Sequence, residues 1–189
     1  MSARTVYYAA MSLDGYIAES DDTLDWLMGF PGVAPAETVQ TVEGGYDEFY
    51  EEVGALVMGS ATYEFVLDEA STWHYGGKHT WVLSSRDLPR FEGAEPLTIT
   101  NAAVTDLYDE MVAAAGDRKL WVVGGGNVAS QFADAGLLDE VWVTVVPVVI
   151  GTGKPLFDRR LPGPPMQLTE ALPRTSGMIE LRFDVRRDA

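Results

Sequence analysis

Three consecutive glycines, Gly124, Gly125 and Gly126, follow the apolar run 120–123 and precede Asn127. Glycine lets the backbone approach a ligand closely, and the helix expected after it offers free amides and a positive dipole to a phosphate. The same pattern also suits a tight strand-to-helix turn. It lacks the Gly-x-Gly-x-x-Gly fingerprint of Rossmann folds, and no phosphate-loop lysine follows it. The pattern therefore indicates an anion-binding turn of another kind.

Two further strand ends carry glycine or hydroxyl groups. These residues are Gly59, Ser60 and Thr62 after the run 55–58, and Ser84, Ser85 and Arg86 after the run 80–83. Ser60 alternatively caps a helix, and Arg86 alternatively lies free on the surface. Because ligands of open α/β sheets gather beyond the carboxyl ends of the strands, three such ends together favour one extended polyanion.

Candidate substrate residues lie near the start of the chain. Asp14 follows the first expected strand, in a segment (10–18) too apolar for ordinary surface. It is either part of an Asp-Gly turn or a catalytic residue that assists protonation if burial raises its pKa. Asp25 and Trp26 place a carboxylate beside an aromatic ring in a loop, as in a lid over a substrate.

The elements that must position these residues alternate between strands and helices, which is typical of an α/β sheet. We expect strands at 5–10, 55–58, 80–83, 97–100 and 120–123, helices at 46–53, 60–67, 104–115 and 128–135, and an irregular segment at 12–45. The chain ends in a β-rich run at 139–150, interrupted by Pro147, and a hairpin at 166–185. This order predicts one domain over 1–189 with a mixed, mostly parallel sheet and antiparallel C-terminal strands.

Charge and composition exclude several classes of function. The 189 residues include 13 basic and 29 acidic side chains, for a formal net charge of −16, and 14 carboxylates but no basic residue lie between Arg4 and Lys78. Such a surface repels nucleic acid and anionic membranes. With no cysteine and two histidines, disulfides and zinc–thiolate sites are excluded and no metal site is expected. We expect a cytoplasmic protein with a small-molecule substrate.

In their order along the chain, the motifs resemble those of the dihydrofolate reductase superfamily, most closely the branch related to the reductase domain of riboflavin biosynthesis. The resemblance covers nearly the whole chain and is carried by the segments 12–15, 58–63, 83–86, 124–127, 138–141, 147–153 and 155–157. It implies a mixed eight-stranded sheet with helices on both faces, NADPH as the hydride donor, and a homodimer formed through the C-terminal β region.

The resemblance also implies roles for single residues. The cofactor pyrophosphate would lie on Gly125, Gly126 and Asn127 with help from Thr62, and the Gly124–Gly125 peptide would be cis. The 2′-phosphate side would be surrounded by Ser84, Ser85 and Arg86. The nicotinamide would lie near Ala10 and Ile17, with Asp14 in the substrate cleft.

Two positions depart from the dihydrofolate reductase pattern. Ser60 and Asn127 stand where those enzymes carry phosphate-binding arginines, so that NAD(P)H binding is better supported than a preference for NADPH. The carboxylate that folate-reducing members carry on the first helix has candidates here in Glu43, Asp47 and Glu48, which alternatively form a solvated helix face.

Three functions remain open: an NADPH-dependent reductase of a small heterocyclic or carbonyl/imine substrate, the 5-amino-6-(5-phosphoribosylamino)uracil reductase of riboflavin biosynthesis, and a non-catalytic nucleotide-binding module. The expected substrate cleft is built largely from residues 5–77, which contain no basic side chain. Lys154 and Arg159 lie on a later loop. A sugar phosphate ordinarily needs arginine or lysine, so the sequence favours a neutral or cationic substrate. The run 141–146 is too apolar for an uncovered sheet edge, which favours a homodimer.

Overall fold

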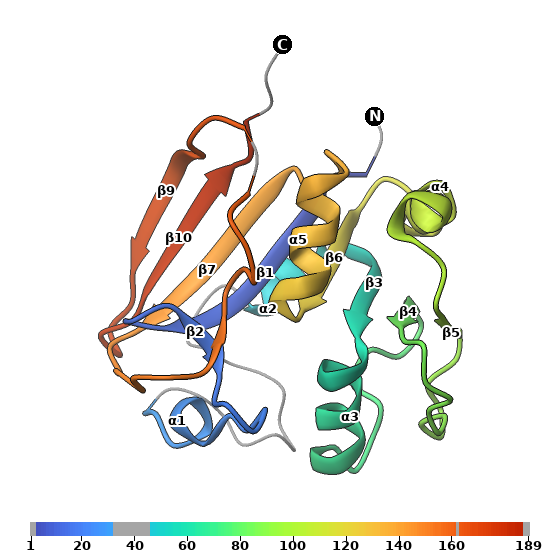
Figure 1. Cartoon of the computed structure of the whole chain (residues 1–189), viewed down its shortest axis with the longest axis horizontal. Coiled ribbons are helices and arrows are strands. Elements are labelled where there is room, and N and C mark those ends of the chain that lie inside the picture. Colours follow the sequence, from blue (N-terminus) through green and yellow to red (C-terminus); the bar gives the residue numbers. More distant parts are fainter. Residues whose placement is uncertain (1–2, 32–45, 162, 187–189) are drawn as a thin grey trace.

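The computed structural model describes residues 3–31, 46–161 and 163–186. An eight-stranded sheet runs through it in the order β5-β4-β3-β6-β1-β7-β10-β9 (Figure 1). Its strands are β1 (Thr5–Ser12), β3 (Val53–Gly59), β4 (His79–Leu83), β5 (Leu97–Thr100), β6 (Lys119–Gly124), β7 (Glu140–Val146), β9 (Gln167–Pro173) and β10 (Ile179–Asp184). From β5 to β7 the neighbouring strands are parallel, whereas β10 is antiparallel to both β7 and β9. The predicted mixed, mostly parallel sheet is confirmed.

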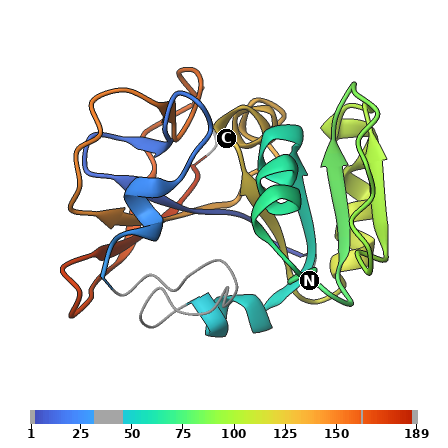
Figure 2. The same ribbon diagram turned by 90° about the horizontal axis from the view of Figure 1, so that it is seen from below.

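Helices cover both faces of this sheet. Side chains of α4 (Val104–Ala115) and α5 (Gly126–Asp134) pack in one apolar cluster, and those of α2 (Tyr46–Glu51) and α3 (Ser60–Glu69) pack in the other. Figure 2 shows α2 across the sheet from α5. Two short elements, α1 (Asp25–Met28) and the antiparallel pair of β2 (Tyr16–Ala18) with β8 (Lys154–Pro155), lie beside the carboxyl ends of the strands.

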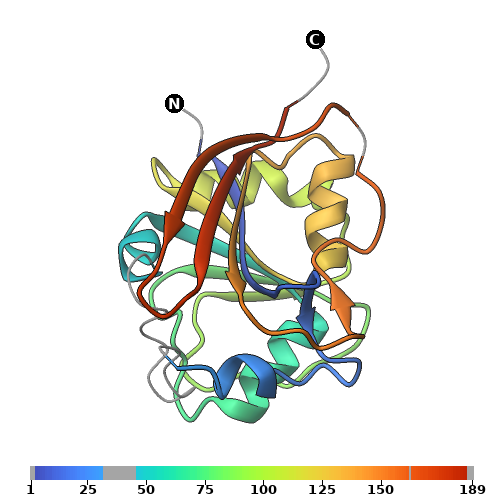
Figure 3. The same cartoon turned by 90° about the vertical axis from the view of Figure 1, so that its left-hand side faces the viewer.

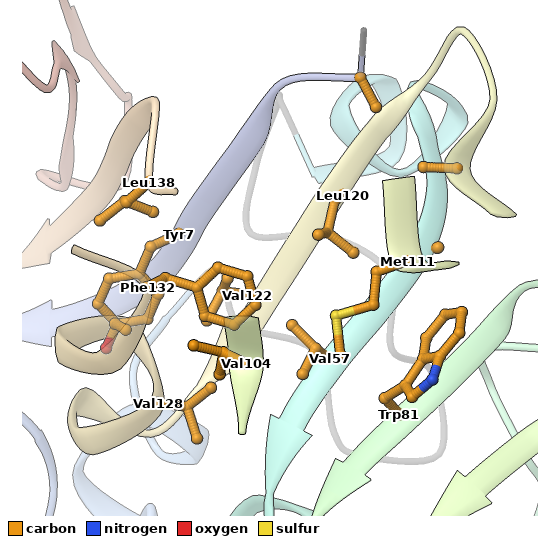
Figure 4. Close-up of a cluster of buried hydrophobic side chains, with 14 of the residues drawn as sticks. Tyr7, Val57, Trp81, Val104, Met111, Leu120, Val122, Val128, Phe132 and Leu138 are labelled. Atoms are coloured by element: carbon orange, nitrogen blue, oxygen red, sulfur yellow. The ribbon is translucent and has the colours of Figure 1, made fainter. Parts of the chain in front are cut away.

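The central strands are buried on both faces, which explains their nearly continuous apolar sequences. In β3, Ala55 and Val57 point into the cluster beneath α4 and α5, whereas Leu56 and Met58 point into the other. Figure 4 shows the first cluster, where Val57 lies near Met111 of α4. The alternation follows from the two-residue period of a strand.

The C-terminal hairpin completes the sheet at one end (Figure 3). Its turn contains Gly177 with φ of 91°, and the Gly177 N–H donates to the Arg174 carbonyl at 3.1 Å. Strand β7 therefore lies between β1 and β10. The expectation that the run 141–146 forms a sheet edge is wrong, because β10 pairs with it along its length. A homodimer then remains a prediction that rests on the resemblance alone.

Local differences from the predicted elements are few. Both α1 and β2 lie in the segment expected to be irregular, part of which (32–45) is outside the described residues. Helix α3 begins with Ser60 and has Gly59 at its N-cap, so Ser60 is not the capping residue. Strand β7 ends at Val146, directly before Pro147. Among the described residues, no helix is long and apolar enough to cross a bilayer.

Candidate active site

A cavity of about 680 Å³ opens at the carboxyl ends of the central strands β1, β3 and β6. Helices α3 and α5 start at its wall, and α1 and β2 contribute to its rim. Parallel strands place their carboxyl ends at one edge of the sheet, which is where ligands of α/β folds bind.

Most of the residues predicted for cofactor binding come together in this cavity. They are Ala10, Ile17, Gly59, Ser60, Thr62, Gly124, Gly125, Gly126 and Asn127. The other three, Ser84, Ser85 and Arg86, line a second hollow of about 450 Å³. Leu83 lines the cavity and Ser84 lines the hollow, so both reach the end of β4.

The two helices that start in the cavity have glycine at the N-cap, Gly59 for α3 and Gly125 for α5, and no N-cap side chain bonds to either helix. The first-turn N–H groups of a helix have no partner within it, and they carry the positive end of its dipole. The two junctions lie against each other, because a Cβ atom on Gly124 would be 3.2 Å from Thr62 Oγ1. The Gly124–Gly125 peptide is cis, as predicted. Together these features form a positively polarised recess built from backbone.

Gly126 is required by packing. A Cβ atom at this position would lie 2.6 Å from the Pro155 carbonyl oxygen and 2.7 Å from that of Leu156. The start of α5 is thus held against the short strand β8.

The Asn127 side chain is already engaged. Its amide nitrogen donates to Asp158 Oδ2 at 2.6 Å, and its oxygen accepts from Gln131 at 2.8 Å. A hydrogen bond from Arg159 lowers the pKa of Asp158, so a carboxylate lies at the rim of the recess. Asn127 can therefore serve an anion chiefly through its main-chain N–H in the first turn of α5.

Arg86 lies in the second hollow as predicted, but its guanidinium forms an ion pair with Glu64. Its guanidinium donates to both carboxylate oxygens of Glu64 on α3, at 2.8 and 2.5 Å. This hydrogen bonding raises the pKa of Arg86. Both side chains are exposed, and exposed ion pairs exchange partners at little cost.

Asp14 joins two loops and does not line the cavity. Its carboxylate accepts from Ser12 Oγ at 2.7 Å, from the Gly151 N–H at 2.7 Å and from the Ile150 N–H at 3.2 Å. The Ser12 hydrogen bond is the largest cause of a lowered Asp14 pKa. The condition for a role in protonation, a pKa raised by burial, is not met, since the side chain is exposed. The geometry gives Asp14 a structural role and does not support the predicted catalytic one.

The other predicted carboxylates that the structure describes do not line the cavity either. Asp25 is exposed, and neither it nor Trp26 lines the cavity, although their neighbours Leu24, Leu27 and Met28 do. Asp47 and Glu48 are exposed on α2, as a solvated helix face would be. Glu43 lies outside the described residues. Lys154 lines the cavity and pairs with Asp22 at 3.3 Å.

Aromatic rings also line the cavity, and none of the sequence motifs indicates them. These rings are Tyr8, Tyr46, Phe65, Tyr75 and Trp121. Trp121 packs edge-on against Tyr46 and Tyr75, with ring centroids 5.8 and 5.9 Å apart. Burial raises the pKa of Tyr8 to about 12 and raises those of Tyr46 and Tyr75 as well, so these hydroxyls stay neutral. The available signal was that Tyr8 and Ala10 share one face of β1.

The mixed sheet, the glycine junction and the cavity at the strand ends together define a protein with the fold of the riboflavin-biosynthesis reductases. The chain belongs to the RibD C-terminal domain family, whose profile matches residues 66–179.

Individual relatives agree with this assignment. The chain is 32% identical over 157 residues to YwjB of Bacillus subtilis (strain 168), an uncharacterised protein, covering 83% of this chain and 84% of YwjB. The crystal structure of a putative riboflavin biosynthesis protein from Shewanella sp. PV-4 superposes with a TM-score of 0.80 at 28% identity, covering 99% of this chain and 100% of that one. The fold, at 14% identity and a TM-score of 0.64, is also that of a diaminohydroxyphosphoribosylaminopyrimidine deaminase/5-amino-6-(5-phosphoribosylamino)uracil reductase from Thermotoga maritima. There the match covers 98% of this chain and 57% of the longer protein.

Proposed function

We propose that this protein is an NAD(P)H-dependent reductase that transfers a hydride to the C=O or C=N group of a small, neutral or cationic heterocycle. The observation that carries the proposal is the lining of one cavity. This lining combines two helix starts and a glycine junction with a group of aromatic rings. Family membership agrees with this assignment.

The residues of the recess fit a dinucleotide. A side chain at Gly124 would approach Thr62 Oγ1 at 3.2 Å, so the backbone lies bare beside that hydroxyl. Main-chain N–H groups at the start of α5, together with Thr62, would hold a pyrophosphate. Ser84, Ser85 and Arg86 in the second hollow would hold the adenosine ribose and a 2′-phosphate. When bound, the cofactor supplies the hydride.

The aromatic rings of the cavity lining suit a flat, uncharged substrate. Tyr46, Tyr75 and Trp121 offer ring faces and edges against which a heterocycle packs, and they exclude water from it. In the proposed arrangement the nicotinamide lies beside Ala10 and Ile17, which also line the cavity. The protein's groups thus orient the substrate, and no carboxylate from the first helix is needed for that task.

The charges of the cavity argue against a phosphorylated substrate. The acidic residues on its described wall are Asp22, Glu69 and Asp158, and the basic one, Lys154, is paired with Asp22. A sugar phosphate would meet net negative charge there. The riboflavin-pathway reaction, which the family favours, is therefore the second candidate.

Turnover separates these possibilities. Oxidation of NADPH is followed by loss of reduced-nicotinamide absorbance with a panel of cyclic imines, pterins and carbonyl compounds, and with the phosphorylated aminopyrimidine of riboflavin biosynthesis. We expect turnover of a neutral compound and little or none of the phosphorylated one. Robust turnover of the phosphorylated compound would establish the second candidate instead. Tight cofactor binding with no turnover of any compound would point to a non-catalytic module.

A further inference from the structure

A buried carboxylate lies one hydrogen bond away from a residue of the cavity lining. Glu180 of β10 is 1% exposed, and it accepts from Arg174 Nη2 at 2.9 Å and from Arg182 Nε at 2.7 Å. Burying a charged cluster is costly, and well-packed apolar side chains often serve stability as well or better. The cluster therefore invites a functional explanation.

Glu180 reaches the cavity through Tyr8. The Tyr8 hydroxyl donates to Glu180 Oε2 at 3.3 Å and lies 3.5 Å from Thr144 Oγ1. Tyr8 and Thr144 both line the cavity, whereas Glu180 does not. In the sheet, Thr144 pairs with Glu180 on one side and with Ala10 on the other. Two residues of the cavity lining are thus linked, through their hydroxyl groups, to one carboxylate that does not line the cavity.

The carboxylate fixes the direction of the hydroxyl protons. Guanidinium groups can only donate, so both Glu180 oxygens act as acceptors. The single Tyr8 proton is used on Glu180, which leaves the Tyr8 oxygen as an acceptor for Thr144 or for a ligand. When Thr144 donates to Tyr8, its own oxygen likewise keeps free lone pairs. Burial, and then the Glu180 charge, raise the pKa of Tyr8 to about 12, which keeps its proton in place at neutral pH.

We propose that Tyr8 and Thr144 form a pair of hydrogen-bond acceptors that selects substrates with an N–H group, and that Glu180 is the positioning residue that orients them. The inference rests on the proposed function for its choice of a heterocyclic substrate. A ligand that presents an oxygen atom to Tyr8 and Thr144 brings acceptors together with no hydrogen between them. The hydroxyl oxygens and the ligand oxygen then lack hydrogen-bond partners, which is strongly disfavoured in a buried site.

Two isosteric probes test the selection without knowledge of the true substrate. Quinolin-2(1H)-one carries a ring N–H where coumarin carries a ring oxygen, and calorimetric titration gives the affinity of each for the full chain. We expect the lactam to bind about tenfold more tightly than the lactone. Tyr8→Phe and Thr144→Val should each reduce this ratio to within about threefold of unity. Tyr7→Phe is the matched control, because Tyr7 directly precedes Tyr8 on β1 and its hydroxyl donates to the Leu156 carbonyl instead.

Glu180→Gln tests the positioning role. A glutamine amide can donate to Tyr8 and so free the Tyr8 proton to face the cavity, which should move the preference toward coumarin. A purely structural Glu180 would leave the ratio unchanged in any folded variant. If Glu180→Gln does not fold, the Tyr8 and Thr144 variants still decide the acceptor pair.

The inference is wrong if wild type binds both probes equally or neither, or if Tyr8→Phe keeps the wild-type ratio. A parallel NADPH titration separates this failure from failure of the proposed function. Wild type that selects the lactam but does not bind NADPH would contradict the reductase assignment alone.

Discussion

The ion pair between Arg86 and Glu64 controls, in our interpretation, how strongly the cofactor's 2′-phosphate is bound. Two guanidinium N–H groups face Glu64 at 2.8 and 2.5 Å. A phosphate carries more negative charge than a carboxylate and accepts the same forked hydrogen bonds. Since the pair is exposed, Glu64 can be displaced, but it competes for the same donors.

Removal of Arg86 should therefore affect NADPH and NADH differently. We expect Arg86→Ala to weaken NADPH by roughly tenfold, the usual effect of losing a charge-assisted contact. NADH, which has no 2′-phosphate, should change by less than about twofold. Glu64→Gln removes the competing charge and should tighten NADPH by about two- to fivefold with no effect on NADH.

Cofactor titration followed by tryptophan fluorescence measures these affinities, because Trp121 lines the cavity. Arg118→Ala is the matched control, because it removes an equal charge from an exposed position just before β6. Arg118 precedes the start of that strand, whereas the cavity lies at its carboxyl end. Equal losses for NADPH and NADH in Arg86→Ala would remove Arg86 from this role. A weaker NADPH complex in Glu64→Gln, or a similar loss in Arg118→Ala, would also contradict the reasoning.

Further predictions concern the glycine junction and Asp14. A Cβ atom on Gly125 would meet Ile17 at 3.9 Å within the cavity, so Gly125→Ala should weaken cofactor binding with little change in melting temperature. Gly126→Ala would instead place its methyl group 2.6 Å from the Pro155 carbonyl oxygen. It should therefore lower the free energy of unfolding by about 1–3 kcal/mol. Equal melting temperatures for the two variants would contradict this expectation. The pKa of Asp14 is lowered from 3.8 by its hydrogen bonds, so it stabilises the fold above that pH and the effect is lost as pH falls through the folded-state pKa. Asp14→Asn should thus lower the melting temperature at pH 7 and match wild type well below pH 3.8, without changing NADPH affinity; weaker NADPH binding would restore a role in the site.

The sequence reveals those features that depend on neighbours along the chain. Strands such as β3 are buried on both faces and so give continuous apolar runs, and the glycine junction is recognisable because its residues are consecutive. Helix α1 has only four residues, too few for a helical pattern in the sequence. Strand β2 is not predicted because Tyr16 and Ala18 pair with a strand more than 130 residues later. Such short strands are set by distant partners more than by their own propensity.

The partners of the predicted site residues could not be predicted for the same reason. Asp14 looks like a free carboxylate until the fold brings Ile150 and Gly151 to it. Similarly, Arg86 looks free until α3 places Glu64 beside it. The sequence of the run 141–146 indicates a strand, but it does not give the position of that strand in the sheet. The pairing of β7 with β10 shows that the run is not an edge. Long-range pairing decides each of these cases.

The structure of the complex with NADP⁺ tests the proposed site most directly. The pyrophosphate should lie within hydrogen-bond distance of main-chain N–H groups at Gly126 or Asn127, with the nicotinamide ring beside Ala10. A dinucleotide bound elsewhere, or a cavity that stays empty at millimolar cofactor, would contradict the assignment of this cavity as the active site of a reductase.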